Sequence, residues 1–115
     1  MDGRTQLPVN EYLRRELCAD YVDTITEAGP VRILAEEQQS ALADSILARV
    51  DISVNKHKSN AIAIVAHHDC AGNPVEKDVQ LGQLEAATKF LSEKYPQVQI
   101  LGLWVDSDWQ VVQYL

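Results

Sequence analysis

The sequence predicts an α/β fold with a mostly parallel open sheet and helices on both faces. Two observations support this class. Residues 61–66 form an uninterrupted apolar run, typical of a strand that is buried on both faces of a parallel sheet. Strand-like segments also alternate with amphipathic helical segments, as the crossover connections of such a sheet require. The 115 residues match the length of one domain, 1–115.

Three helices are expected where apolar residues recur every three or four positions. They cover residues 7–17, residues 31–57 with an interruption near 36–39, and residues 79–94. Pro8 suits the first turn of the first helix, because a proline there loses no hydrogen bond. The buried stripe of the last helix is expected to be Val79, Leu84, Ala87, Leu91 and Tyr95.

Four segments have the composition or the apolar pattern of strands. They are residues 21–26, 61–66, 98–105 and 109–114. The last of them follows a tight turn at 106–108 and is expected to be antiparallel to its neighbour. Ligands of parallel α/β sheets bind beyond the carboxyl ends of the strands. The loop after Ala66 is therefore the first place to look for a functional site.

Charge and cysteine content narrow the expected partners and location. The formal net charge of −7 opposes binding to nucleic acid, and no basic stripe is present. The longest apolar run, 61–66, is too short to cross a membrane. No signal-peptide pattern is found, and two cysteines, Cys18 and Cys70, are expected as free thiols. We therefore expect a cytoplasmic protein with no nucleic-acid or membrane partner.

The loop after residues 61–66 contains two potential metal ligands, His67 and Cys70. A neutral imidazole and a thiolate with two residues between them can hold one zinc ion from a single turn of chain. The motif is short, so a hydrogen-bonded histidine beside a buried cysteine is an open alternative. Cys18 lies at a helix end, far from this loop in the sequence, and is expected to be a small core residue.

The polar residues around these motifs have functional and structural explanations. His68 is expected to face solvent, where it could relay protons. Asp69 is expected to bond backbone amides of its own loop. From these two residues alone, Asp2 and Arg4 are expected to be charged residues of a frayed terminus, and a charge-assisted pair is the alternative.

Together these residues resemble the β-class carbonic anhydrases. That family places C-x-D-x-R at the end of its first strand and H-x-x-C after a later strand. Asp2 and Arg4 match D-x-R, while His67 and Cys70 match H-x-x-C. The stretches D-G-R-T-Q-L-P and D-C-A-G-N-P are similar to those of short, divergent carbonic anhydrase-like proteins of prokaryotes. The similarity extends over most of residues 1–106.

The resemblance implies a Rossmann-like β-carbonic anhydrase fold and a lyase reaction, the reversible hydration of CO2 to bicarbonate by a zinc-bound hydroxide. It implies that His67 and Cys70 are metal ligands and that Asp2 and Arg4 are the catalytic pair, in which Arg4 fixes the carboxylate near the zinc. In the family, a first strand and a first cysteine ligand precede the segment that matches Met1. Both are therefore expected to be missing from this sequence.

Three interpretations remain open at this point. The chain is a zinc-dependent carbonate dehydratase whose natural start lies upstream of Met1, or it is inactive as it stands because one ligand is absent. Alternatively, it is a noncatalytic homologue used for weak metal binding or oligomeric assembly. The third interpretation, an unrelated α/β binding domain, is disfavoured by the resemblance.

The resemblance also predicts a gap in the middle of the sheet, between residues 21–26 and residues 61–66. Unpaired backbone groups at such a gap are costly. The two segments can close up and pair, residues 21–26 can detach, or a second copy can fill the space. We expect closing up or strand exchange, and hence a homodimer with residues 7–17 and 21–26 at its interface.

Overall fold

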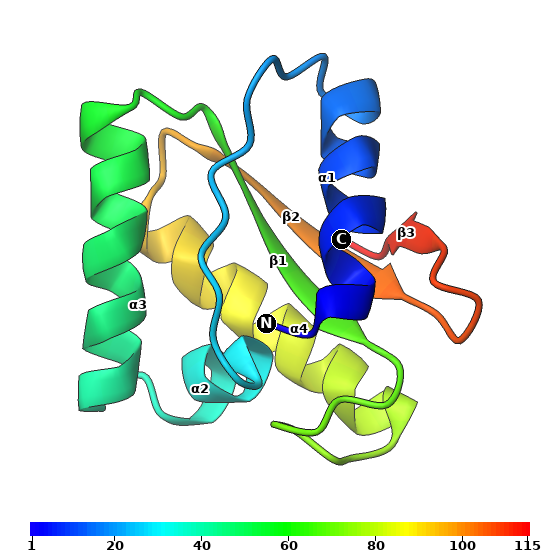
Figure 1. Cartoon of the computed structure of the whole chain (residues 1–115). Coiled ribbons are helices and arrows are strands. Elements are labelled where there is room, and N and C mark those ends of the chain that lie inside the picture. The colour runs from blue at the N-terminus through cyan, green and yellow to red at the C-terminus, as the bar shows by residue number, and fades with distance from the viewer.

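The computed structural model describes all 115 residues and contains four α-helices, one π-helical turn and three strands (Figure 1). The elements are, in order, α1 (Gly3–Glu16), α2 (Pro30–Glu36), α3 (Ala41–Asp51), η1 (Ile52–Lys56), β1 (Ala61–His67), α4 (Lys77–Lys94), β2 (Gln99–Val105) and β3 (Val111–Gln113). None of the helices combines the length and the apolar character that crossing a membrane would need.

The α/β class is confirmed, and the sheet is small and mixed. Its strands lie in the order β1-β2-β3. β1 and β2 are parallel, in register from Ala61 opposite Gln99 to His67 opposite Val105. β3 is antiparallel to β2 and covers only Val111–Gln113, so the last predicted strand is present but shorter than 109–114. The sheet thus contains one parallel pair rather than a broad parallel array.

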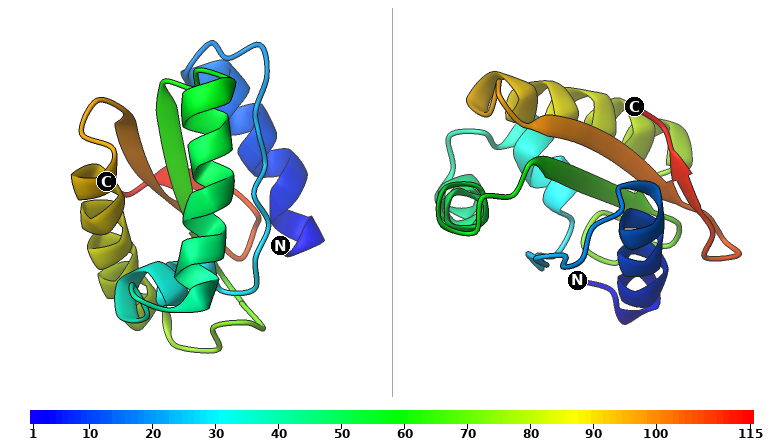
Figure 2. Two further views of the ribbon diagram at one scale, coloured as in Figure 1. Left: turned by 90° about the vertical axis from the view of Figure 1, so that its left-hand side faces the viewer. Right: turned by 90° about the horizontal axis from the view of Figure 1, so that it is seen from above.

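Alternating side chains of β1 and β2 divide the core between the two faces of the sheet. One face contributes to a cluster of 16 buried residues, which includes Ile64, Ala66 and Trp104 together with residues of α2, α3 and α4. The other face contributes Leu101 and Leu103 to a cluster of only three buried residues, completed by Leu13 of α1. Figure 2 shows α1 and α4 on opposite sides of the sheet.

The predicted helices are present with changed boundaries. α1 begins at Gly3 instead of residue 7, because the Asp2 carboxylate caps it by accepting a hydrogen bond from the Arg4 backbone N–H at 3.0 Å. The expected interruption of the second helix separates α2 from α3, where Ser40 caps the Ala43 backbone N–H at 3.1 Å. In α4 the predicted stripe is buried except for Val79, which is 49% exposed.

The prediction of a strand at residues 21–26 is wrong. This segment runs extended between α1 and α3 in Figure 1, and residues 18–28 pair with no strand. The Glu27 backbone oxygen accepts instead from the Met1 ammonium group at 3.1 Å. Its β-branched residues are used for packing instead, because Ile25 contacts the large cluster and Val22 contacts the small one. A strand needs a partner for its backbone groups, and no strand lies directly beside this segment. Closing up against β1, one of the two expected repairs, is not observed.

Candidate functional site

His67 is the last residue of β1, and its ring is oriented by its own loop. His67 is 7% exposed, and its Nδ1 lies 2.7 Å from the backbone oxygen of His68. Because a carbonyl oxygen only accepts, Nδ1 is the donor of this bond, and Nε2 is the ring nitrogen that remains available to a ligand. Gln80 of α4 donates from Nε2 to the His67 backbone oxygen at 3.0 Å and ties the strand end to the helix.

The loop that carries Cys70 is held by a close contact between two backbones. Gly29 precedes α2 with a φ of +59°, and an added Cβ there would lie 2.6 Å from the Gly72 carbonyl oxygen. A Cβ on Gly72 would in turn lie 2.7 Å from the Gly29 nitrogen. Only glycine permits this approach on both sides. The contact therefore fixes the chain two residues beyond Cys70 against the start of α2.

Asp2 and Arg4 form the charge-assisted pair, so the expectation of a frayed terminus is wrong. The Arg4 guanidinium donates from Nη2 to Asp2 Oδ2 at 2.6 Å and from Nε to Asp2 Oδ1 at 3.1 Å. Hydrogen bonds from Arg4 hold the pKa of Asp2 well below its usual range. The bonds from the Arg4 side chain have the largest effect, and the bond from its backbone N–H has the next largest. Asp2 is therefore an anion at neutral pH.

Arg4 also connects the start of α1 to the loop after β1. Its Nη1 donates to Asp69 Oδ2 at 3.3 Å, and its Nη2 donates to the Asp69 backbone oxygen at 3.2 Å. Asp69 thus bonds Arg4 and not the amides of its own loop, contrary to the expectation. Its left-handed backbone, with a φ of 57°, directs both groups toward α1. Two motifs that are 65 residues apart are joined by this contact.

Trp109 is a site residue that sequence reasoning missed. The Arg4 guanidinium carbon lies 4.4 Å from the centre of the Trp109 ring, and the Trp109 and His67 ring centres are 6.5 Å apart. The residue was expected in the terminal strand, but it lies in the turn before β3. The rule that directed attention to the end of β1 applies equally to the turn after the parallel strand β2, and would have found it.

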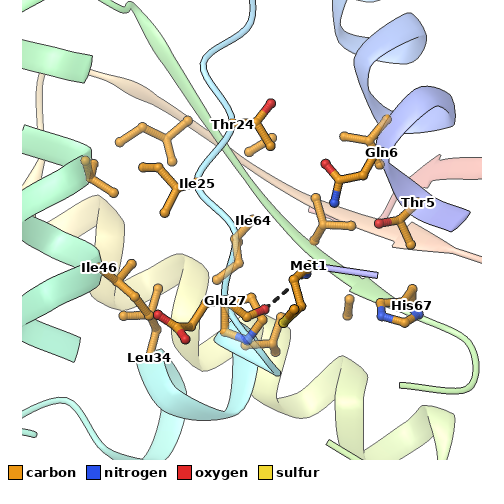
Figure 3. Close-up of a pocket in the computed structure, with 18 of the residues that line it drawn as sticks. Met1, Thr5, Gln6, Thr24, Ile25, Glu27, Leu34, Ile46, Ile64 and His67 are labelled. Carbon is orange, nitrogen blue, oxygen red and sulfur yellow. Dashed lines mark hydrogen bonds between the residues drawn. The ribbon is translucent and has the colours of Figure 1, made fainter. Parts of the chain in front are cut away.

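A cavity of about 540 Å³ lies next to Asp2, His67 and Cys70 (Figure 3). All seven residues of β1 line it, as do Met1, Asp2, Cys70 and most of residues 21–31. Figure 3 shows Thr5 and Gln6 of α1, Ile64 and His67 of β1, and the segment from Thr24 to Glu27 around the same space. Its walls are largely apolar, with polar groups near His67 and the start of α1 and others near the start of β1.

The remaining sequence candidates lie outside this arrangement. His68 is exposed, as expected. Cys18 is also exposed, at a positive φ just after α1, so the expectation of a core residue is wrong. No group of three or more histidine, cysteine, aspartate or glutamate side chains is arranged to hold a metal ion. His67 and Cys70 are thus two potential ligands without a third from this chain.

The fold and the site define a class of protein: an α/β protein that brings a D-x-R pair and an H-x-x-C loop together at the carboxyl end of a parallel strand. Residues 1–114 match a family model described as "Putative carbonic anhydrase". The chain belongs to this family of carbonic anhydrase-like proteins. Searches of the curated proteins and of the solved structures found no significant match to the chain.

Proposed function

We propose that this chain is a carbonic anhydrase-type protein that acts on CO2 and bicarbonate at the carboxyl end of β1. The observation that carries the proposal is the contact of Arg4 with both Asp2 and Asp69. This contact places the Asp2–Arg4 ion pair at the start of α1 beside the loop of His67 and Cys70, the two motifs by which the sequence resembles the β-class carbonic anhydrases. The apolar cavity behind them offers space for a small uncharged gas.

His67 and Cys70 fit two positions of a zinc site. Imidazole and thiolate are ligands that zinc prefers, and Nε2 of His67 is left free by the bond that Nδ1 makes. A bound zinc would supply a water molecule with a pKa near neutrality. Two ligands from the chain are one fewer than the three protein ligands of a typical catalytic zinc site. We therefore propose weak and incomplete zinc binding by the chain alone.

Asp2 and Arg4 would act as a fixed acceptor beside the metal ligands. Because the pKa of Asp2 is held well below its usual range, the carboxylate accepts hydrogen bonds throughout the neutral range and does not release a proton there. Arg4 donates to Oδ1 from its backbone N–H and from Nε, and to Oδ2 from Nη2, so Oδ2 is the oxygen that would accept from a reactant. The pair would thereby orient a proton-bearing oxygen without exchanging its own proton.

Zinc content and CO2 hydration, measured on the same purified chain, test this proposal. We expect less than one zinc per chain and hydration little above the uncatalysed rate, because two ligands hold the ion weakly. One zinc per chain with rapid hydration would contradict the incomplete ligand set. The absence of both zinc and bicarbonate binding would contradict the proposed function itself.

We further propose that a second copy of the chain covers the free edge of β1. The backbone groups of Asn60 and His68 form hydrogen bonds with β2. The N–H and C=O groups of the even-numbered residues of β1 therefore point toward β2. Ala61, Ala63 and Val65 therefore direct their N–H and C=O groups toward the cavity, where no backbone partner meets them. Leu7 of α1 is 64% exposed and Tyr21 is 92% exposed, which supports an interface on these segments.

Sedimentation equilibrium of the chain and its variants tests the dimer. We expect a species of twice the 12.8 kDa chain mass at micromolar concentration. Replacing Leu7 and Tyr21 by serine should shift the equilibrium to the monomer. The matched control is Val79→Ser, which removes an apolar group of 49% exposure from α4 on the other face of the sheet and should leave the dimer intact. A folded wild-type monomer at high micromolar concentration would exclude the dimer.

A further inference from the structure

We propose that Trp109 is a positioning residue for the reaction, because its ring holds the Arg4 guanidinium in the orientation that fixes Asp2. This inference rests on the proposed function, since it assigns Trp109 a role at the same site. The ring of Trp109 lies 4.4 Å from the Arg4 guanidinium carbon, within the range in which an aromatic face attracts a cation.

The hydrogen bonds of the Arg4 side chain all involve the N–H groups of its guanidinium, and the guanidinium carbon takes part in none of them. Asp2 accepts from Nε and Nη2, and Asp69 accepts from Nη1 and Nη2, so both contacts lie at the edge of the planar group. These hydrogen bonds act on the N–H groups, and none of them acts on the guanidinium carbon. The Trp109 ring adds a restraint there, because the attraction depends on the position of the cation over the ring.

The ion pair with Asp69 is a weak substitute for this restraint. The Asp69 side chain is 70% exposed and that of Arg4 is 46% exposed, so water screens the charges. Trp109 is only partly exposed, and its ring also lies 6.5 Å from the ring centres of both His67 and His68. The ring is thus close both to the arginine and to the two histidines of the loop.

The turn that carries Trp109 is built to hold the ring at this place. Trp109 has a φ of 59°, a backbone conformation that is unfavourable for a bulky side chain. Asp106 compensates: its backbone oxygen accepts from the Trp109 N–H at 3.0 Å, and its carboxylate accepts from the backbones of Asp108 and Gln110. Strain that the surrounding hydrogen bonds maintain is typical of functional positions.

The test is the NMR signal of the Arg4 Nε–H group in Trp109→Phe and Trp109→Leu chains. In the wild type we expect this signal upfield, because of the ring current, and protected from exchange with water. Leucine should move it to the position of a free arginine and accelerate its exchange several-fold, whereas phenylalanine should preserve most of the effect. The matched control is Tyr12→Leu, which removes the ring under Arg15 on the same helix and should leave Arg4 unchanged.

The same variants separate the positioning role from the proposed function. If the wild type hydrates CO2, Trp109→Leu should lower the rate and Trp109→Phe should largely restore it. If neither the wild type nor any variant binds zinc or bicarbonate, the proposed function fails while the Arg4 signal still decides the positioning claim. An Arg4 signal that is identical in wild type and Trp109→Leu overturns the claim. Should that variant not fold, Arg4→Gln must shift the indole signal of Trp109 and not that of Trp104, and an unmoved Trp109 signal overturns it equally.

Discussion

Replacing Gly29 by alanine is expected to destabilise the protein by about 2–4 kcal/mol, the sum of a left-handed backbone penalty and a steric clash. The residue has a φ of +59°, and the new methyl group would lie 2.6 Å from the Gly72 carbonyl oxygen. Backbone atoms cannot rotate away as a flexible side chain can. Urea unfolding followed by far-ultraviolet circular dichroism measures the change as a lower midpoint with an unchanged slope.

Gly82→Ala provides the matched control, because it is the same substitution in open space. Gly82 lies within α4 and is exposed, with no atom within 4 Å of an added Cβ. Alanine should therefore raise the stability by roughly 0.5–1 kcal/mol through its better helix propensity. Opposite signs for the two variants are expected, and equal stability of Gly29→Ala and the wild type would show that the Gly29–Gly72 contact does not hold the loop.

Cys70→Ser is expected to remove whatever zinc the chain binds. A serine hydroxyl keeps the size of the thiol approximately but does not ionise at neutral pH, so the ion loses one of only two ligands. Titration with a competing zinc indicator should show the same weak response as a chain without the site. Far-ultraviolet circular dichroism should remain that of the wild type, because Cys70 is only partly buried.

Cys18→Ser is the control for a general effect of thiol loss. Cys18 is exposed beyond the end of α1 and does not line the cavity, so its replacement should leave zinc binding unchanged. Equal loss of zinc in the two variants would contradict the assignment of Cys70. Zinc retained in full by Cys70→Ser would contradict it as well.

The parts of the fold that could be predicted from the sequence are those that local pattern determines. β1 was predictable because an unbroken apolar run is the pattern of a strand covered on both faces, and both faces of β1 do contribute to a cluster. The break between α2 and α3 was predictable because the helical apolar pattern is interrupted near residues 36–39. Residues 21–26 have equally strong strand composition, but whether a strand forms depends on a neighbour with free backbone groups at the right distance, and that is a property of the whole fold.

The candidate site divides along the same line. The sequence could offer the Asp2–Arg4 pair as an alternative because only one residue separates the two in the chain. The contact of Arg4 with Asp69 could not be predicted, because Asp69 could equally have bonded the backbone amides of its own loop. Only the packing of α1 against the sheet decides between these two sets of partners. Trp109 was hidden by the apolar residues after it, which extended the predicted strand over a residue that belongs to the turn.

The unequal size of the two buried clusters implies that α1 can open while the rest of the molecule remains folded. On the face of the sheet that α1 covers, the cluster has three buried residues. The cluster that joins α2, α3 and α4 on the other face has 16. Local opening costs less where fewer apolar contacts are lost. Since α1 carries Asp2 and Arg4, and β1 carries His67, the two halves of the site belong to regions of different local stability. The fraction of molecules with an assembled site is therefore set by a partial unfolding equilibrium, and any contact that retains α1 raises that fraction.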